Sequence, residues 1–280
     1  MINRKYRWGY VLVIILCIAA MAAGAKYDWQ VTDALYNPKS FFGVWFEAAS
    51  WIPIYAFVPV WGATLMLRRK NTMTQFSFGA VLLIASCCAF NYLICDHLVA
   101  RGFMSKINPY MCGIVGGIVS AAIFLVLRGV SRPVLRRIQA MCSFGFMYMF
   151  SYLGVIFVLK KIFGRDRYED IIAGGEYLFA EWFKPVFFSD GSSFPSGHTG
   201  AAMGILILLL LPFLFENCKK LKAPLFVICY GFAILTAISR LIMGRHFISD
   251  TAAAILIMTV VFIILAPKFE KTYRRIIIKE

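Results

Sequence analysis

The chain has few ionisable side chains for its length. Only 15% of its 280 residues are charged and only three are histidine. Acidic residues are scarcer than basic ones, 14 against 29, so the formal net charge is +15. Hydrophobic residues make up 61% of the chain, which leaves too little polar surface to cover a soluble domain. The composition therefore excludes an ordinary soluble protein and predicts an integral membrane protein.

Eight apolar segments have about the length of a membrane-spanning helix, which is roughly 20 residues. They cover residues 8–25, 51–67, 76–95, 111–128, 141–159, 199–215, 223–242 and 247–266. We interpret the first as a retained helix and not a signal peptide, because it lacks a clear small-residue cleavage site. The predicted fold is an all-α polytopic membrane helix bundle of about eight transmembrane helices, forming a single domain over residues 1–280.

Most basic residues lie in alternate connections between the predicted helices. These connections are 4–7, 68–70, 128–137, 219–222 and 268–279. An excess of basic residues marks the cytoplasmic side of a membrane protein, so both termini are predicted to be cytoplasmic in the cell membrane. The positive charge is then a signal for topology, and no nucleic-acid partner is predicted. The eight cysteines show no metal-ligand spacing. Cys95 and Cys112 could form a disulfide, and two free thiols are the alternative.

Two of the predicted external connections are long. The first, residues 26–50, carries Asp28 and Glu47 and is expected to lie along the membrane surface. The second, residues 160–198, contains the stretch Glu176–Phe188, which mixes aromatic and charged side chains. That stretch suits an interfacial helix or a lid, and a packed surface loop without substrate contact is the alternative.

Three polar runs begin at Lys160, Ser193 and Ser239, each at the outer end of a predicted helix. Ionisable groups at a membrane edge are costly, so they are candidates for function. In the second run, Ser196 and Gly197 directly precede a predicted helix, where exposed N–H groups and the helix dipole favour an anion. The three outer ends are predicted to converge on one pocket at the extracytoplasmic face.

The third run places a histidine and a carboxylate on one helical face. His246 and Asp250 are four residues apart, so Asp250 can accept a proton from one ring nitrogen and leave the other basic. Capping of the helix by the same pair is the alternative interpretation. Cationic side chains at Lys160, Arg167 and Arg240 suit phosphate oxygens.

These runs resemble the three motifs of the type-2 phosphatidic acid phosphatase superfamily, KxxxxxxRP, PSGH and SRxxxxxHxxxD. The second motif is intact at Pro195–His198 and the third at Ser239–Asp250. The first matches at Lys160 and Arg167, but Tyr168 stands in place of the proline. Members mostly have a six-helix core, so this chain carries an extra N-terminal pair of helices. The motif-bearing core covers about residues 141–266.

The resemblance implies an enzyme that hydrolyses a phosphomonoester or diphosphate of a lipid, without a metal or other cofactor. His246 would attack phosphorus and form a phosphohistidine, Asp250 would orient it, and His198 would protonate the leaving group. The phosphate would be bound by Lys160, Arg167, Arg240, Ser196 and Gly197.

Other functions stay open at this stage. The chain could transfer phosphate from a lipid diphosphate to another lipid, or be a non-catalytic lipid-binding or transport protein of the same fold. A metal-dependent hydrolase is disfavoured because the site lacks the several carboxylates that hard cations prefer. The superfamily also includes soluble vanadate-dependent haloperoxidases, which the composition disfavours. The particular lipid headgroup and the oligomeric state are not predicted.

Overall fold

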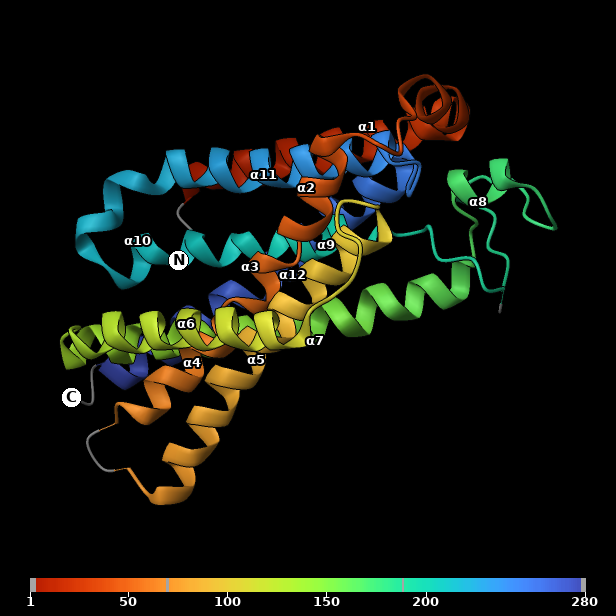
Figure 1. The fold of residues 1–280 in the computed structure, drawn as a ribbon. Helices are drawn as coiled ribbons and strands as arrows, with labels where there is room; N and C mark the ends of the chain where they lie inside the picture. The colour runs from red at the N-terminus through yellow and green to blue at the C-terminus, as the bar shows by residue number, and fades with distance from the viewer. Residues whose placement is uncertain (1–3, 69–70, 188, 278–280) are drawn as a thin grey trace. The chain divides into compact units, whose positions relative to one another are not determined.

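The structure is a computed structural model that describes residues 4–68, 71–187 and 189–277, and the described residues form helices and loops without a strand (Figure 1). The helices are α1 (Arg4–Leu35), α2 (Phe41–Ala49), α3 (Ile52–Tyr55), α4 (Phe57–Met66), α5 (Met73–Ala100), α6 (Pro109–Arg128), α7 (Arg132–Phe163), α8 (Tyr168–Ala173), α9 (Gly197–Ala202), η1 (Met203–Leu210), α10 (Leu211–Leu214), η2 (Glu216–Leu221), α11 (Lys222–Ile242) and α12 (Ile248–Ile277). Of the basic residues that predict the topology, Arg69, Lys70 and Lys279 lie outside the described residues.

Eight helical stretches of the described chain are long and apolar enough to cross a membrane. They are Arg7–Leu35, Phe41–Met66, Met73–Ala100, Pro109–Arg128, Arg132–Ala173, Gly197–Leu214, Glu216–Ile242 and Ile248–Tyr273. The prediction of an all-α bundle with about eight transmembrane helices is therefore confirmed.

The chain divides into two compact units, Met1–Trp51 with Tyr148–Glu280, and Ile52–Met147. In the smaller unit α4 packs against α5, and α5 against α6. A Cβ atom on Gly62 or Gly79 would lie 2.6 Å from the backbone oxygen of the other residue. These two glycines therefore allow the close approach of α4 and α5, as small residues do between membrane helices.

The cysteine pair of the smaller unit is reduced. Cys95 and Cys112 both carry free thiols, and their sulfur atoms lie 3.6 Å apart. Of the two alternatives that the sequence left open, a disulfide or two thiols, this structure has the two thiols. The buried thiol of Cys112 packs as a small apolar group.

The larger unit contains all three polar runs. Figure 1 shows α1 (red) beside α11 and α12 (blue), and α1 packs along both of them. The hydroxyl of Tyr148 on α7 donates to the carbonyl oxygen of Met258 on α12 over 2.9 Å. These contacts bring the C-terminal end of α7 and the start of α12, which carry Lys160 and Asp250, into the same unit.

The expectation for residues 26–50 is wrong. Residues 26–35 continue α1, and α2 follows after a short connection. Instead of lying along the surface, Asp28 and Glu47 are only 1% and 2% exposed. Each buried carboxylate is stabilised by an arginine, Asp28 by Arg165 and Glu47 by Arg240. Residues 26–50 therefore contribute to the interior of the larger unit.

The expected interfacial helix at Glu176–Phe188 is not formed within the described residues, and Phe188 lies outside them. The segment is instead an irregular loop attached to α1. The indole nitrogen of Trp182 donates to the carbonyl oxygen of Met21 over 2.9 Å. The ring of Phe179 packs against Trp29, with the ring centroids 5.6 Å apart. These side chains bind the loop to α1, which explains why it does not form a separate amphipathic helix.

Candidate active site

His246 lies between α11 and α12 and is buried. Gly244, with a φ of 64°, ends α11 and turns the chain towards the histidine. The Nδ1 atom of His246 is 2.7 Å from the carbonyl oxygen of Ser193. A carbonyl oxygen only accepts hydrogen bonds, so the proton of the neutral ring is on Nδ1 and the lone pair is on Nε2.

The pKa of His246 is lowered to about 3, first by burial and then by the nearby charges of Lys160 and Arg167, whereas Asp250 opposes the shift. The imidazole is therefore neutral at pH 7. A neutral ring with its lone pair on Nε2 can act as a nucleophile.

The low pKa of His246 predicts a loss of stability in acid. The ordinary pKa of histidine is about 6.5, so an unfolded chain binds a proton that the folded protein binds only near pH 3. The stabilisation is complete above pH 6.5 and is lost as the pH falls towards 3, by up to about 1.4 kcal/mol per pH unit. We expect His246→Gln to melt with a weaker dependence on pH than the wild type over this range. Melting in detergent at several pH values measures the difference, and parallel curves would contradict it.

Asp250 binds three other groups more closely than it binds His246. Its carboxylate accepts from the backbone N–H of Phe247 (2.8 Å) and the hydroxyl of Ser193 (2.5 Å), and it pairs with Arg165 (2.6 Å). The contact with Phe247 caps the first turn of α12, which is the alternative that the sequence left open. The nearest carboxylate oxygen is 3.8 Å from Nδ1 of His246, beyond hydrogen-bond distance. Ser193 therefore connects the two residues, since its hydroxyl binds Asp250 and its carbonyl binds His246.

Arg165 is a member of the site that sequence reasoning did not single out. Its guanidinium pairs with Asp250 and, over 3.0 Å, with Asp28 of α1. It also donates to the hydroxyl of Ser249 (2.9 Å) and the carbonyl oxygen of Ala180 (2.7 Å). Arg165 is thus a buried cation shared by two carboxylates, and it connects the first helix to the start of α12.

Replacing Arg165 by methionine is expected to lower the free energy of unfolding by about 3–5 kcal/mol, because two buried carboxylates lose their shared cation. Thermal unfolding in detergent measures the change. Lys184→Met is the matched control, since it removes an exposed ion pair with Glu181, and little change is expected there. Equal melting temperatures for the two variants would contradict the role assigned to Arg165.

Lys160 and Arg167 meet at Ser192. The ammonium group of Lys160 donates to the carbonyl oxygen of Ser192, and Nη2 of Arg167 donates to its hydroxyl over 2.8 Å. Within the described part of the chain, Nε of Arg167 is buried and has no hydrogen-bond partner. The first motif thus places two cations on one loop residue, with one N–H donor of Arg167 still available.

Tyr168, which replaces the proline of the first motif, has a structural role in this chain. Its hydroxyl donates to a carboxylate oxygen of Asp33 over 2.5 Å. Its ring packs against Trp29 and Tyr36, with centroid distances of 4.9 and 5.1 Å. The start of α8, which follows Arg167, is therefore held against α1 by a tyrosine.

The second motif forms the start of α9. The side chain of Ser196 accepts from the backbone N–H of Thr199 over 3.3 Å, so it caps the helix. The carbonyl oxygen of Gly197 accepts from the hydroxyl of Tyr152 over 3.0 Å. The ring centroid of His198 is 6.5 Å from that of His246. The two motif histidines therefore face the same small region.

Arg240 is fully buried and is held by residues of α2. Its Nη2 donates to the carbonyl oxygen of Gly43 over 2.5 Å, and its Nη1 is 3.4 Å from a carboxylate oxygen of Glu47. Glu47 also lies 3.8 Å from Arg245, which pairs with Glu169 over 2.5 Å. A second ion-pair cluster, buried at Arg240 and Glu47, therefore adjoins the third motif, and Glu47 comes from a segment that was predicted to lie at the surface.

The apolar bundle defines the class of this chain, an integral membrane protein, and its cluster of histidines and cations suits phosphate chemistry. Residues 140–274 match the family model described as the PAP2 superfamily. The predicted resemblance is thus confirmed. The chain is similar to phosphatidylglycerophosphatase B of Bacillus subtilis (strain 168), with 28% identity over 192 residues, 64% of this chain and 85% of that protein. No solved structure matches the chain.

Proposed function

We propose that this protein hydrolyses a phosphomonoester or diphosphate of a membrane lipid at the extracytoplasmic face, without a metal and through a phosphohistidine on His246. The superfamily match supports phosphatase chemistry. The name of the similar Bacillus protein supports a lipid phosphate as the substrate. The distribution of basic residues supports cytoplasmic termini and an external site.

One observation carries the choice of His246 as the nucleophile. Its Nδ1 is bound by the carbonyl oxygen of Ser193, which leaves the lone pair on Nε2. Its low pKa, about 3, keeps that lone pair unprotonated at neutral pH. In the proposed reaction Nε2 forms a bond to phosphorus as the bond from phosphorus to the lipid oxygen breaks. Water then breaks the phosphorus–nitrogen bond and releases inorganic phosphate.

The cations supply the electrostatic part of this chemistry. Phosphoryl transfer depends on positioning and on stabilising charge at the equatorial phosphate oxygens. Lys160 and Arg167 lie close enough to His246 to lower its pKa, and the Nε of Arg167 can donate to a phosphate oxygen. Fixed cations of this kind neutralise phosphate without a metal ion. We assign Arg240, Ser196 and Gly197 to the same phosphate site.

His198 is the proposed acid for the leaving group. In an in-line displacement the attacking and leaving groups lie on opposite sides of phosphorus. The ring centroids of His198 and His246 are 6.5 Å apart, so both side chains are close enough to act on one phosphate group. His198 would give its proton to the lipid oxygen in the first step and accept one from water in the second. Asp250 would position His246 through Ser193.

A panel of lipid phosphates tests the proposal. Purified wild-type protein in detergent micelles would be given phosphatidic acid, phosphatidylglycerophosphate, an isoprenyl diphosphate and a lipid A phosphate, with and without EDTA. We expect inorganic phosphate from at least one of them, with no effect of EDTA. Phosphate that appears on an added lipid alcohol instead would indicate a phosphotransferase. Loss of activity with EDTA, or no release from any lipid, would overturn the proposal.

A further inference from the structure

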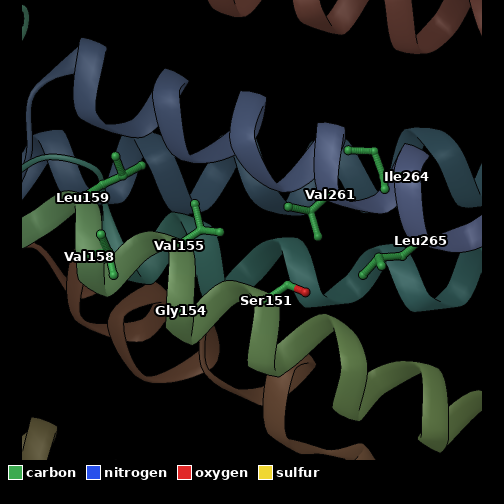
Figure 2. A pocket seen from close by; sticks show the side chains of 8 residues that line it. All are labelled: Ser151, Gly154, Val155, Val158, Leu159, Val261, Ile264 and Leu265. Atoms are coloured by element: carbon green, nitrogen blue, oxygen red, sulfur yellow. The ribbon is translucent and has the colours of Figure 1, made fainter.

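An apolar groove runs between α7 and α12 (Figure 2). Its volume is about 480 Å³. It is lined by Ser151, Gly154, Val155, Val158 and Leu159 of α7, and by Val261, Ile264 and Leu265 of α12. Figure 2 shows Leu159 and Val158 towards one end of the groove, and Ile264 and Leu265 towards the other. Aliphatic side chains thus form nearly all of its wall.

Gly154 of α7 leaves part of the groove without a side chain. A Cβ atom added to Gly154 would meet no other atom within 4 Å. Neighbouring wall residues are exposed although they are aliphatic, among them Val158 (55%) and Ile264 (52%). Both helices are long and apolar enough to cross a membrane, so this exposed face lies where hydrocarbon surrounds the protein.

The groove begins next to the candidate active site. Leu159 directly precedes Lys160, whose ammonium group binds Ser192 in the site. From Leu159 to Ser151 the wall of α7 extends over eight residues, about 12 Å at the rise of an α-helix. One leaflet of a bilayer has a hydrocarbon thickness of about 15 Å. The α7 wall of the groove therefore has about the depth of a single leaflet, measured from the helix end that carries Lys160.

We propose that this groove binds a hydrocarbon tail of the substrate while its phosphate lies at His246. The proposal rests on the proposed function, because it assigns the tail of the same lipid. The occupant is the acyl or prenyl chain nearest the phosphate, and its apolar surface matches the aliphatic wall. The enzyme would thereby select phosphates attached to long chains that remain in one leaflet.

A substitution that places a larger side chain in the groove tests this assignment. Gly154→Leu adds a side chain where space is open, and leucine is a better helix former than glycine, so α7 is expected to fold. We expect kcat/KM to fall about tenfold to hundredfold for dioleoyl phosphatidic acid, because several methylene contacts are lost. For dihexanoyl phosphatidic acid, whose tails are too short to fill the groove, kcat/KM should stay within about twofold of the wild type.

Gly231→Leu is the matched control. Gly231 lies in α11, and a Cβ atom there also meets nothing within 4 Å, but this residue does not line the groove. Its activity on both lipids should equal that of the wild type. An equal loss on both lipids in Gly154→Leu, or no loss on either, would overturn the groove assignment.

A direct label gives a second result that does not depend on turnover. His246→Ala protein would be mixed with phosphatidic acid that carries a diazirine in its acyl chain, irradiated, and digested. We expect labelled peptides that contain residues 151–159 or 261–265, and no such label in the Gly154→Leu, His246→Ala double variant. Labels elsewhere would overturn the groove assignment and leave the proposed function standing. Wild-type protein that hydrolyses no lipid phosphate would overturn the proposed function instead.

Discussion

His246→Ala is expected to lower phosphate release from the best lipid substrate by at least about 10⁴-fold, because the nucleophile of the covalent route is removed. The variant should also form no phosphoenzyme. The measurement is rapid denaturation in base after mixing with radiolabelled lipid phosphate, since a phosphohistidine survives base and is lost in acid. Wild-type protein should retain label under these conditions and His246→Ala should retain none.

His198→Ala is the informative control for this experiment. A proton donor to the leaving group contributes about 10²–10⁴-fold, so hydrolysis of the lipid should fall by that amount. With p-nitrophenyl phosphate, whose leaving group needs no proton, the loss should be much smaller. The variant should still form a labelled phosphoenzyme. Labelled His246→Ala protein, or equal losses on both substrates in His198→Ala, would contradict the assigned roles.

The helical spans and the motif residues were predictable because both are local in sequence. A spanning helix needs about 20 apolar residues in a row, and such runs are visible without any tertiary contact. The spacing of His246 and Asp250 on one helical face is likewise a local property. Even so, the sequence predicted a direct contact between them, and the structure inserts Ser193. That contact joins residues 53 positions apart and depends on how the second motif packs.

The ion-pair partners were not predictable in the same way. Asp28 and Arg165 are 137 positions apart, and their pairing depends on the packing of α1 along α12. Glu47 did carry a signal, since it is the single charged residue of the apolar run from Phe41 to Pro59. A carboxylate in such a run is costly unless it is paired, so a buried arginine partner could have been expected. Which arginine binds it depends on the fold.

The ion pairs of Asp28 and Glu47 suggest what the N-terminal helices of the larger unit contribute to the site. Asp28 on α1 holds Arg165, which holds Asp250, and Glu47 on α2 holds Arg240. These helices precede the segment that matches the superfamily. In this chain, therefore, residues from outside the matched segment position motif residues within it.

Asp250→Asn is expected to lower kcat by about 10²–10³-fold and to change KM little, because Asp250 positions the nucleophile and does not bind the lipid. An asparagine keeps the shape of the side chain but not the charge that pairs with Arg165 and receives the hydroxyl of Ser193. The carbonyl oxygen of Ser193 would then hold Nδ1 of His246 less accurately. Steady-state rates on the best lipid phosphate, taken well below the melting temperature of the variant, measure the effect.

Two further variants separate positioning by Asp250 from a general loss of structure. Ser193→Ala keeps the backbone carbonyl that binds His246 but loses the hydroxyl that binds Asp250, so a smaller loss of about tenfold is expected. Thr251→Val is the matched control, because the hydroxyl of Thr251 binds only the carbonyl oxygen of Ile248 in its own helix. It should retain the wild-type rate. A wild-type kcat in Asp250→Asn would contradict the connection through Ser193, since the carboxylate would then contribute to folding alone.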